Sequence, residues 1–398
     1  MSFAFAGKRN VLITVFLAGM TCCNLLLASR VIAPLREGLQ DFTIYYMAGR
    51  LVREGRAAAL YDMGVQYRTQ VRFALVPSPE ETKPFNHPAF EALLFVPFTL
   101  LPYWPAYLGW TFLSLVLLGI ALILLRRFPG IRELPPMLLA LGGLAFFPVA
   151  MDLLQGQDAI LLLLLAVLAW TCLERGADAS AGAWLAGGLF RPHIVLPLLV
   201  LLAARRRRML AGFAPVALIL AGISVAIPGS GGPLAYIQFV LRGERPHEGF
   251  LPRHLPTLRG LISVLPGIHN SPHLTAGLIL AVSLAMFGMA LHRIRTGPDS
   301  LAHSFCLASV TAILVSFHAF SYDLTLLLPL ALFMLREATG AEGTLNGTGC
   351  FLLFLLFLTP AYIFLVMKIK FFALFGLVLL ALYVRLVSMP APAEPACG

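Results

Sequence analysis

VLITVFLAGMTCCNLLLA, residues 11–28, is an apolar run without a charged side chain. A helix of this length crosses a hydrocarbon core of about 30 Å. The run MLAGFAPVALILAGISVAI at residues 209–227 has the same character, and similar blocks recur along the chain. Of the 398 residues, 59% are hydrophobic and only 12% are charged, whereas roughly a quarter of an ordinary soluble domain is charged. The sequence therefore predicts an all-α, polytopic membrane protein and excludes a soluble enzyme.

The basic residues gather at the ends of the apolar blocks, in clusters at residues 8–9, 126–132, 205–208, 293–295 and 336. Lys and Arg favour the cytoplasmic side of a membrane, which accounts for this placement. The formal net charge of +10 therefore indicates membrane orientation and does not indicate a nucleic-acid partner. With all the clusters inside, both termini are expected to be cytoplasmic.

This topology predicts about ten crossings. They are expected at about 10–30, 103–126, 134–150, 159–174, 209–227, 273–292, 301–317, 321–336, 349–366 and 370–388. Residues 31–85 and 228–272 form two exterior loops, and a turn is expected at 151–158. Residues 88–101, bounded by Pro88 and Pro102, are too short to cross and predict an interfacial or re-entrant helix. We expect one domain over 1–390 and a short tail over 391–398.

Residues 181–203 are apolar, yet both ends of this segment are expected on the cytoplasmic side. Pro192 interrupts it, because proline breaks a helix. The segment thus predicts a broken hairpin of two half-helices, with Arg191 and His193 at its buried tip. An arginine at membrane depth is costly and is usually functional, whereas His193 has an equally good structural role as a partner of carbonyls freed by Pro192.

Several chemical signatures are missing. The chain has no phosphate-binding GxxxxGK[ST] loop, no GxGxxG after a strand and no HExxH. It has no Asp-x-Asp pair of the kind that holds a metal-bound nucleotide sugar, and its six cysteines lack the spacing of metal ligands. We therefore expect no cofactor and no metal site, and the sequence disfavours a nucleotide-dependent transferase.

The stretch DFTIYY, residues 41–46, opens a predicted amphipathic helix that lies along the membrane surface. Asp41 has two possible roles, either as the N-cap of this helix or as a general base at the water–lipid boundary. Tyr45 and Tyr46 are either interface aromatics or residues that stack on a sugar. The sequence leaves both alternatives open.

Further motifs follow in a fixed order. They are Leu60-Tyr61-Asp62, His87-Pro88-x-Phe90, Pro97, Leu101-Pro102, Trp110, Gln155-Gly156-Gln157, Gly187 to Pro192, Ser316-Phe317-His318, Tyr322 and Pro329. Together with Asp41 and the two tyrosines, they resemble glycosyltransferase family 87 over about residues 38–335. Arg191 stands where the family more often has lysine, and Ala89 stands where it often has a second proline. Arginine keeps the positive charge at that position.

The resemblance implies a GT-C membrane fold and an inverting transfer of a hexose, with mannose favoured. The donor would be a polyprenyl-phosphate sugar, and the acceptor a lipid or glycan at the exterior face of the cytoplasmic membrane. Asp41 would be the base, while Arg191, His193 and His318 would hold the leaving phosphate, which needs positive charge rather than an acid. The expected substrate contacts are Tyr45, Tyr46, His87, Gln157 and Tyr322. For Gln157 and His318, helix capping and an ordinary interfacial histidine remain alternatives.

A second class of function also fits this pattern. A transporter or flippase of lipid-linked sugars would share the arginine at depth but would not need a base at Asp41. A non-catalytic assembly partner is a third class. Replacing Asp41 by asparagine separates the transferase from the flippase, because only the transferase depends on that carboxylate.

Overall fold

The computed structural model describes residues 2–243, 250–267, 271–297, 300–340 and 345–389. All regular elements in these ranges are helices, so the prediction of an all-α protein is confirmed. The first half of the chain forms α1 (Ser2–Arg30), α2 (Ile32–Arg36), α3 (Phe42–Arg53), α4 (Met63–Gln70), α5 (Ala92–Phe95), α6 (Tyr103–Leu125), α7 (Pro129–Arg132), α8 (Pro136–Ala145), α9 (Phe147–Gln155), α10 (Ala159–Glu174) and α11 (Asp178–Ala186). The second half forms α12 (Pro192–Ala203), α13 (Met209–Ala226), α14 (Gly232–Gly243), α15 (Phe250–Arg253), α16 (Leu258–Ser263), α17 (Pro272–Thr296), α18 (Leu301–Val315), α19 (Leu328–Thr339), α20 (Gly347–Phe357), α21 (Thr359–Ile363) and α22 (Gly376–Ser388).

Short helical turns connect several of these helices. They are η1 (Ala57–Ala59), η2 (Pro79–Glu81), η3 (Ala89–Glu91), η4 (Pro97–Leu100), η5 (Tyr322–Leu327), the π-helical turn η6 (Phe364–Lys368) and η7 (Phe372–Phe375). The predicted short helix at residues 88–101 is thus divided among η3, α5 and η4. The predicted tail at 391–398 lies outside the described residues.

Four helices in the described part are long and apolar enough to cross a membrane: Lys8–Arg30 of α1, and all of α6, α13 and α17. Two bent pairs, α8 with α9 and α20 with α21 and η6, raise this number to six if each pair is one span. The expected count of about ten crossings is not confirmed. Length is the reason, because the other apolar helices have 10–17 residues, and a helix of 12 residues rises only about 18 Å.

Prolines explain where both pairs bend. The bend between α8 and α9 is 57° and that between α20 and α21 is 58°. Pro148 and Pro360 each occupy the first turn of the second helix, where proline has no amide hydrogen and disfavours a helical residue before it. The first of these pairs also corrects the predicted turn at 151–158, because α9 continues to Gln155.

The segment predicted as a broken hairpin contains two helices, α11 and α12, separated at residues 187–191. Arg191 directly precedes α12, and Pro192 occupies the first turn of that helix. The interruption therefore lies where the proline predicts it.

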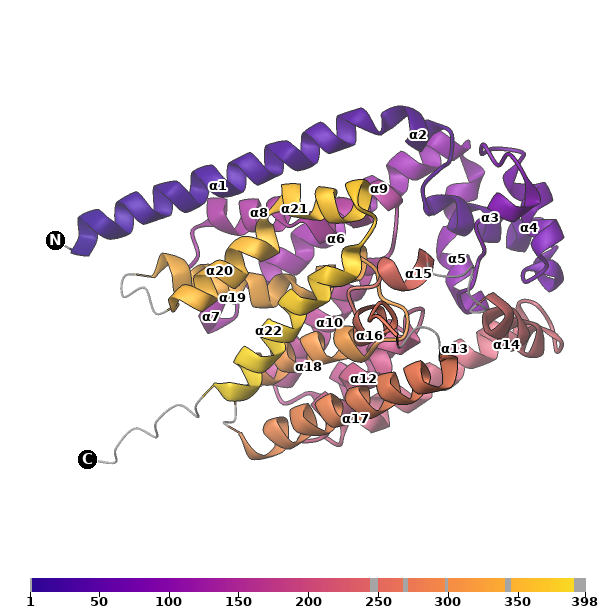
Figure 1. The fold of residues 1–398 in the computed structure, drawn as a ribbon. Coiled ribbons are helices and arrows are strands. Elements are labelled where there is room, and N and C mark those ends of the chain that lie inside the picture. The colour runs from indigo at the N-terminus through magenta and orange to yellow at the C-terminus, as the bar shows by residue number, and fades with distance from the viewer. Residues whose placement is uncertain (1, 244–249, 268–270, 298–299, 341–344, 390–398) are drawn as a thin grey trace.

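The basic clusters gather at one end of the helix bundle, where α1 begins and α22 ends (Figure 1). Hydrogen bonds and ion pairs connect the segments there. They join Arg9 to the Gly340 carbonyl, Arg336 to Glu133, Arg205 to the Gly297 carbonyl, Arg293 to the Met389 carbonyl and Arg385 to Glu337. The segments that carry these clusters therefore share one end of the bundle, as expected if they lie on one side of a membrane.

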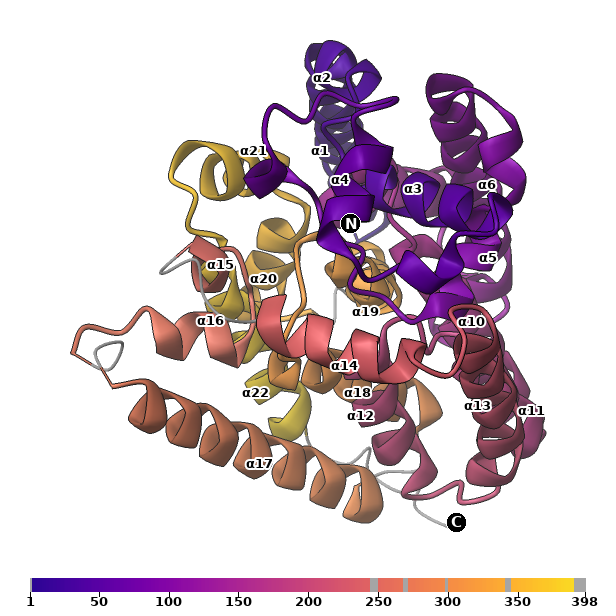
Figure 2. The same cartoon turned by 90° about the vertical axis from the view of Figure 1, so that its right-hand side faces the viewer.

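The helices α2 to α5 lie at the opposite end of the bundle (Figure 1), and α14 runs close to them in both views (Figure 2). The two predicted exterior loops meet there, because the rings of Tyr61 and Tyr236 lie 5.2 Å apart. A separate core of buried aromatic and aliphatic residues fills this end. Most of α3, including Phe42 to Gly49, is buried in that core. Aromatic residues from α5 and α6 pack against the apolar face of α3, so this face is buried inside the protein, while the predicted position of α3 along the membrane surface stays a prediction.

Candidate active site

Asp41 stands at the N-terminus of α3, but its carboxylate does not cap that helix. Asp41 Oδ1 accepts a 3.0 Å hydrogen bond from Lys83 Nζ, and Asp41 Oδ2 accepts a 2.8 Å hydrogen bond from Gln157 Nε2. The Asp41 side chain is 28% exposed. The Asp41 carboxylate thus makes no capping hydrogen bond, is oriented by two donors and remains partly accessible to solvent. Such a carboxylate can accept a proton from a bound molecule.

The close approach of α3 to the end of α9 places Asp41 beside its partners. Gly156 ends α9 with a left-handed φ of 62°, a conformation that glycine adopts without strain. A β-carbon on Gly156 would lie 2.7 Å from the Phe42 Cβ atom, so only glycine lets the two segments meet. Gln155 then accepts a hydrogen bond from the Asp41 amide, and Gln157 reaches the Asp41 carboxylate.

The Gln157 side chain is a buried junction between three groups. Its Nε2 atom donates to Asp41, while its Oε1 atom accepts from the Tyr45 hydroxyl at 2.6 Å and from Arg191 Nη2. The Trp110 indole also donates to the Gln157 carbonyl. Gln157 is only 2% exposed, so in this structure it orients Asp41 and does not present its amide to solvent.

Arg191 is 3% exposed and lies between two buried aspartates. Its Nη2 atom is 2.6 Å from Asp158 Oδ1, and its Nη1 atom is 2.7 Å from Asp323 Oδ1. The guanidinium carbon also lies 5.1 Å from the centre of the Tyr322 ring. The sequence-predicted Arg191 and Tyr322 are therefore brought together, and both ends of the guanidinium are already engaged by carboxylates.

His193 lies in the first turn of α12 and His318 follows α18, and their rings lie 6.3 Å apart in an edge-to-face arrangement. Burial and the nearby Arg259 and Arg191 guanidinium groups lower the pKa of His318 to about 4. His318 is therefore neutral at pH 7 and offers hydrogen bonds, not positive charge. His193 Nε2 is buried without a hydrogen-bond partner among the described residues.

Tyr45 and Tyr46 occupy the aromatic core. Tyr45 is fully buried, with its ring stacked on Phe95 at 4.6 Å. Tyr46 is 4% exposed, and its hydroxyl donates to the Leu101 carbonyl. Neither ring presents a free face on which a sugar could stack in this structure. Both tyrosines are therefore packing residues of the aromatic core next to the site.

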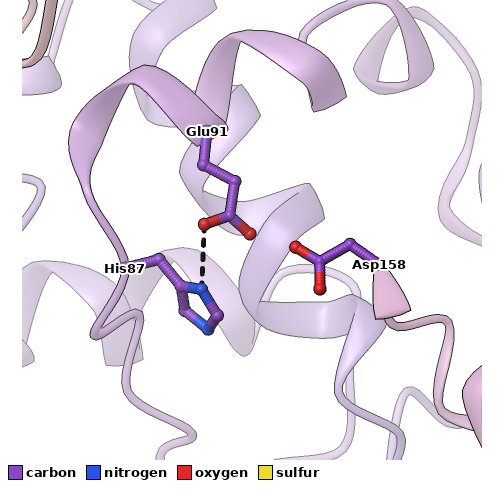
Figure 3. A group of neighbouring side chains, drawn as sticks. All are labelled: His87, Glu91 and Asp158. Carbon is purple, nitrogen blue, oxygen red and sulfur yellow. Dashed lines mark ion pairs between the residues drawn. The ribbon is translucent and has the colours of Figure 1, made fainter. Parts of the chain in front are cut away.

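A second cluster joins His87, Glu91 and Asp158 (Figure 3). His87 Nδ1 lies 2.8 Å from Glu91 Oε2, and the Glu91 carboxyl group points toward Asp158. Burial and the neighbouring Asp158 carboxylate raise the pKa of Glu91 well above its usual range. Burial also lowers the pKa of His87 to about 4. The expected substrate residue His87 thus belongs to a buried polar group that borders Tyr45, since their rings lie 5.3 Å apart.

The sequence predictions missed four residues of this region: Lys83, Glu91, Asp158 as a partner of Arg191, and Asp323. Two of them had a recognisable signal. Lys83 is one of only four lysines in a chain rich in arginine. Glu91 follows His87 by four residues inside an apolar segment, where an unpaired charge is costly.

The family model described as "Glycosyltransferase family 87" matches residues 85–316, which is more than half of the chain. No curated protein and no solved structure matches. The matched region includes His87, Gln157, Arg191 and His193, whereas Asp41 and Lys83 precede it and His318 follows it. The functional assignment of those three residues therefore rests on motif order and on the contacts described above.

Proposed function

Because the chain belongs to glycosyltransferase family 87, we propose that this membrane glycosyltransferase moves a hexose, with mannose favoured, from a polyprenyl phosphate to a lipid or glycan acceptor. The reaction would take place at the exterior face of the cytoplasmic membrane and invert the anomeric carbon. Asp41 directly precedes α3, and α3 lies at the end of the bundle opposite the start of α1 (Figure 1), which supports this choice of face.

The observation that carries the proposal is the double hydrogen bonding of Asp41. Gln157 fixes one carboxylate oxygen and Lys83 fixes the other, although neither residue lies near Asp41 in the sequence. In the proposed reaction, the acceptor hydroxyl gives its proton to Asp41 as its oxygen attacks the anomeric carbon. The bond from that carbon to the phosphate oxygen then breaks, and the phosphate leaves with the electron pair.

The leaving phosphate is already anionic, so it requires hydrogen-bond donors and positive charge. We propose that His193 and His318 donate hydrogen bonds to this phosphate. Arg191 would orient the carboxylates of Asp158 and Asp323 and contribute its positive charge. Lys83, whose side chain is 33% exposed, adds an accessible cation beside the base. Gln157 would act through its hydrogen bond to Asp41, Tyr322 through its contact with Arg191 and Tyr45 through its hydrogen bond to Gln157, which revises their expected role as sugar contacts. Membership of a transferase family also favours this function over a flippase.

The test is transfer from labelled polyprenyl-phosphate mannose in liposomes that contain host lipid extract. We expect wild-type protein to form a labelled product and Asp41→Asn to lower the rate by about 10²- to 10⁴-fold, because the general base is lost. Asp62→Asn is the matched control. Asp62 is exposed and caps α4 through the Val65 amide, a role that asparagine also fulfils.

Equal product from wild type and Asp41→Asn would remove Asp41 from the chemistry. Lipid flipping that survives Asp41→Asn, without any transfer by the wild type, would favour the transporter. Loss of product in the Asp62→Asn control would indicate that the loop as a whole, and not the Asp41 carboxylate, controls the rate.

A further inference from the structure

The interior of the site carries an excess of acidic groups. Glu91, Asp152, Asp158 and Asp323 are each 0% exposed. The ion pairs in the described part of the chain give two of them, Asp158 and Asp323, the same cationic partner, Arg191. Buried carboxylates are stable only when a cation or a proton compensates them. These groups therefore require either a retained proton or a further cation close to them.

Three of the side chains in this region place possible metal-ligand atoms close together. One imidazole nitrogen of His87, one carboxylate oxygen of Glu91 and one carboxylate oxygen of Asp158 all lie within 4.8 Å of one another. The three side chains converge from the His87–Glu91 segment and from the residue that precedes α10 (Figure 3). His87 and Glu91 are four residues apart in one short segment, whereas Asp158 lies between the end of α9 and the start of α10.

Two of these carboxyl groups, those of Glu91 and Asp158, face each other. The Glu91 and Asp158 carboxyl groups lie within hydrogen-bonding distance of each other, and no donor in the described part of the chain reaches Glu91 Oε1 or Asp158 Oδ2. Asp158 Oδ1 is bound to Arg191, so the free oxygen is the one available to the cluster. Two buried carboxyl groups that face each other in this way need either a shared proton or an ion between them.

We propose that His87, Glu91 and Asp158 bind a divalent transition-metal ion of the zinc or manganese class. A single imidazole with two carboxylates suits these ions, whereas calcium and magnesium prefer oxygen ligands alone. Arg191 then holds Asp158 from outside the metal site, as partners of metal-binding carboxylates commonly do. The ion would supply positive charge beside His87, whose ring borders Tyr45, and would balance the buried carboxylates.

The three residues give no metal signature in the sequence, because their spacing is not that of a known motif and 67 residues separate Glu91 from Asp158. The sequence accordingly predicts no metal. The fold supplies the third ligand, which is why this site becomes visible only in three dimensions.

The test is metal uptake by tag-free protein in nanodiscs, after treatment with a chelator and dialysis against ZnCl₂, MnCl₂ or MgCl₂. We expect about one zinc or manganese ion per chain by elemental analysis, and no retained magnesium. Glu91→Gln and His87→Gln should each weaken binding by more than about tenfold. Glu81→Gln, an exposed glutamate nearby in the chain, should bind as the wild type does. X-ray absorption at the zinc edge should show one imidazole ligand.

Wild-type protein that retains neither zinc nor manganese would overturn the proposal and assign the compensating charge to a proton shared by Glu91 and Asp158. Equal uptake by wild type, Glu91→Gln and His87→Gln would overturn it as well, because the ion would then bind elsewhere. If one variant fails to fold in a thermal-unfolding assay, the metal stoichiometry of the wild type and the binding by the other variant still test the proposal. Uptake is measured without donor or acceptor, so its result does not depend on the proposed transfer.

Discussion

Gln157 Nε2 donates a 2.8 Å hydrogen bond to Asp41 Oδ2 across 116 residues of sequence. The orientation of this amide is determined by its other partners. Arg191 and the Tyr45 hydroxyl both contact Gln157 Oε1, and arginine can only donate. The Gln157 nitrogen must therefore face Asp41, and Asp41 must present an acceptor oxygen to it.

Gln157→Glu tests this relationship with almost no change in shape. The new carboxylate still accepts from Tyr45 and Arg191, but it cannot donate to Asp41 and adds a like charge beside it. We expect the transfer rate to fall about 100-fold, because the base loses its orientation. Steady-state kinetics should show the loss mainly in kcat. An unchanged kcat would mean that Gln157 does not position the base.

Lys83→Gln tests the second partner of Asp41. The two side chains are 33% and 28% exposed, so their ion pair contributes at most about 1 kcal/mol to stability. The variant should thus unfold near the wild-type temperature. Its kcat/KM for the donor should nevertheless fall about 10- to 100-fold, the effect of losing a hydrogen bond from a charged donor.

Lys83→Arg is the matched control for this charge. Because it keeps the positive charge, we expect it to retain more activity than Lys83→Gln. Two variants of equal activity would show that the charge of Lys83 does not matter, and a large drop in the unfolding temperature of Lys83→Gln would show a mainly structural role.

Gly156→Ala should separate Asp41 from Gln157. Alanine in the left-handed conformation costs about 1–2 kcal/mol, and its β-carbon would also clash with Phe42. Gly176→Ala is the control, because Gly176 has a similar φ of 70° but no atom within 4 Å of a new β-carbon. We expect Gly156→Ala to lower both the unfolding temperature and the activity more than Gly176→Ala does. Equal effects would mean that backbone strain alone matters.

The helices themselves could be predicted from the sequence because each depends on a local run of apolar residues. The helix expected at 159–174 has those bounds in the structure, and that expected at 103–126 ends one residue earlier. The number of crossings could not be predicted in this way. Short apolar helices such as α12 and α18 satisfy the same composition rule as a span, but they lack its length.

The candidate site was only partly predictable, because its contacts join segments that are distant in sequence. The motifs pointed to Asp41, Gln157 and Arg191, and the structure joins these three residues in one hydrogen-bonded chain. They did not reveal that Asp323, 132 residues from Arg191, would accept a hydrogen bond from Arg191 Nη1. A phosphate site and a buried ion pair have the same local sequence around an arginine, and only the fold distinguishes them.

His318 gives a prediction for the dependence of stability on pH. Burial, together with Arg259 and Arg191, lowers the pKa of His318 to about 4 from its ordinary 6.5. Above pH 6.5 this residue is neutral in both the folded and the unfolded chain. Between pH 6.5 and about 4 the unfolded chain binds a proton that the folded chain does not, so stability falls as the pH falls.

Thermal unfolding in detergent across this pH range should therefore give a shallower slope for His318→Gln than for the wild type. The slope will not vanish, because the half-buried His87 also has a lowered pKa. His273→Gln is the control, since His273 is exposed on α17, and it should follow the wild-type curve. Identical slopes for wild type and His318→Gln would mean that the pKa of His318 is the same in the folded and the unfolded chain, so that burial does not keep this residue neutral below pH 6.5.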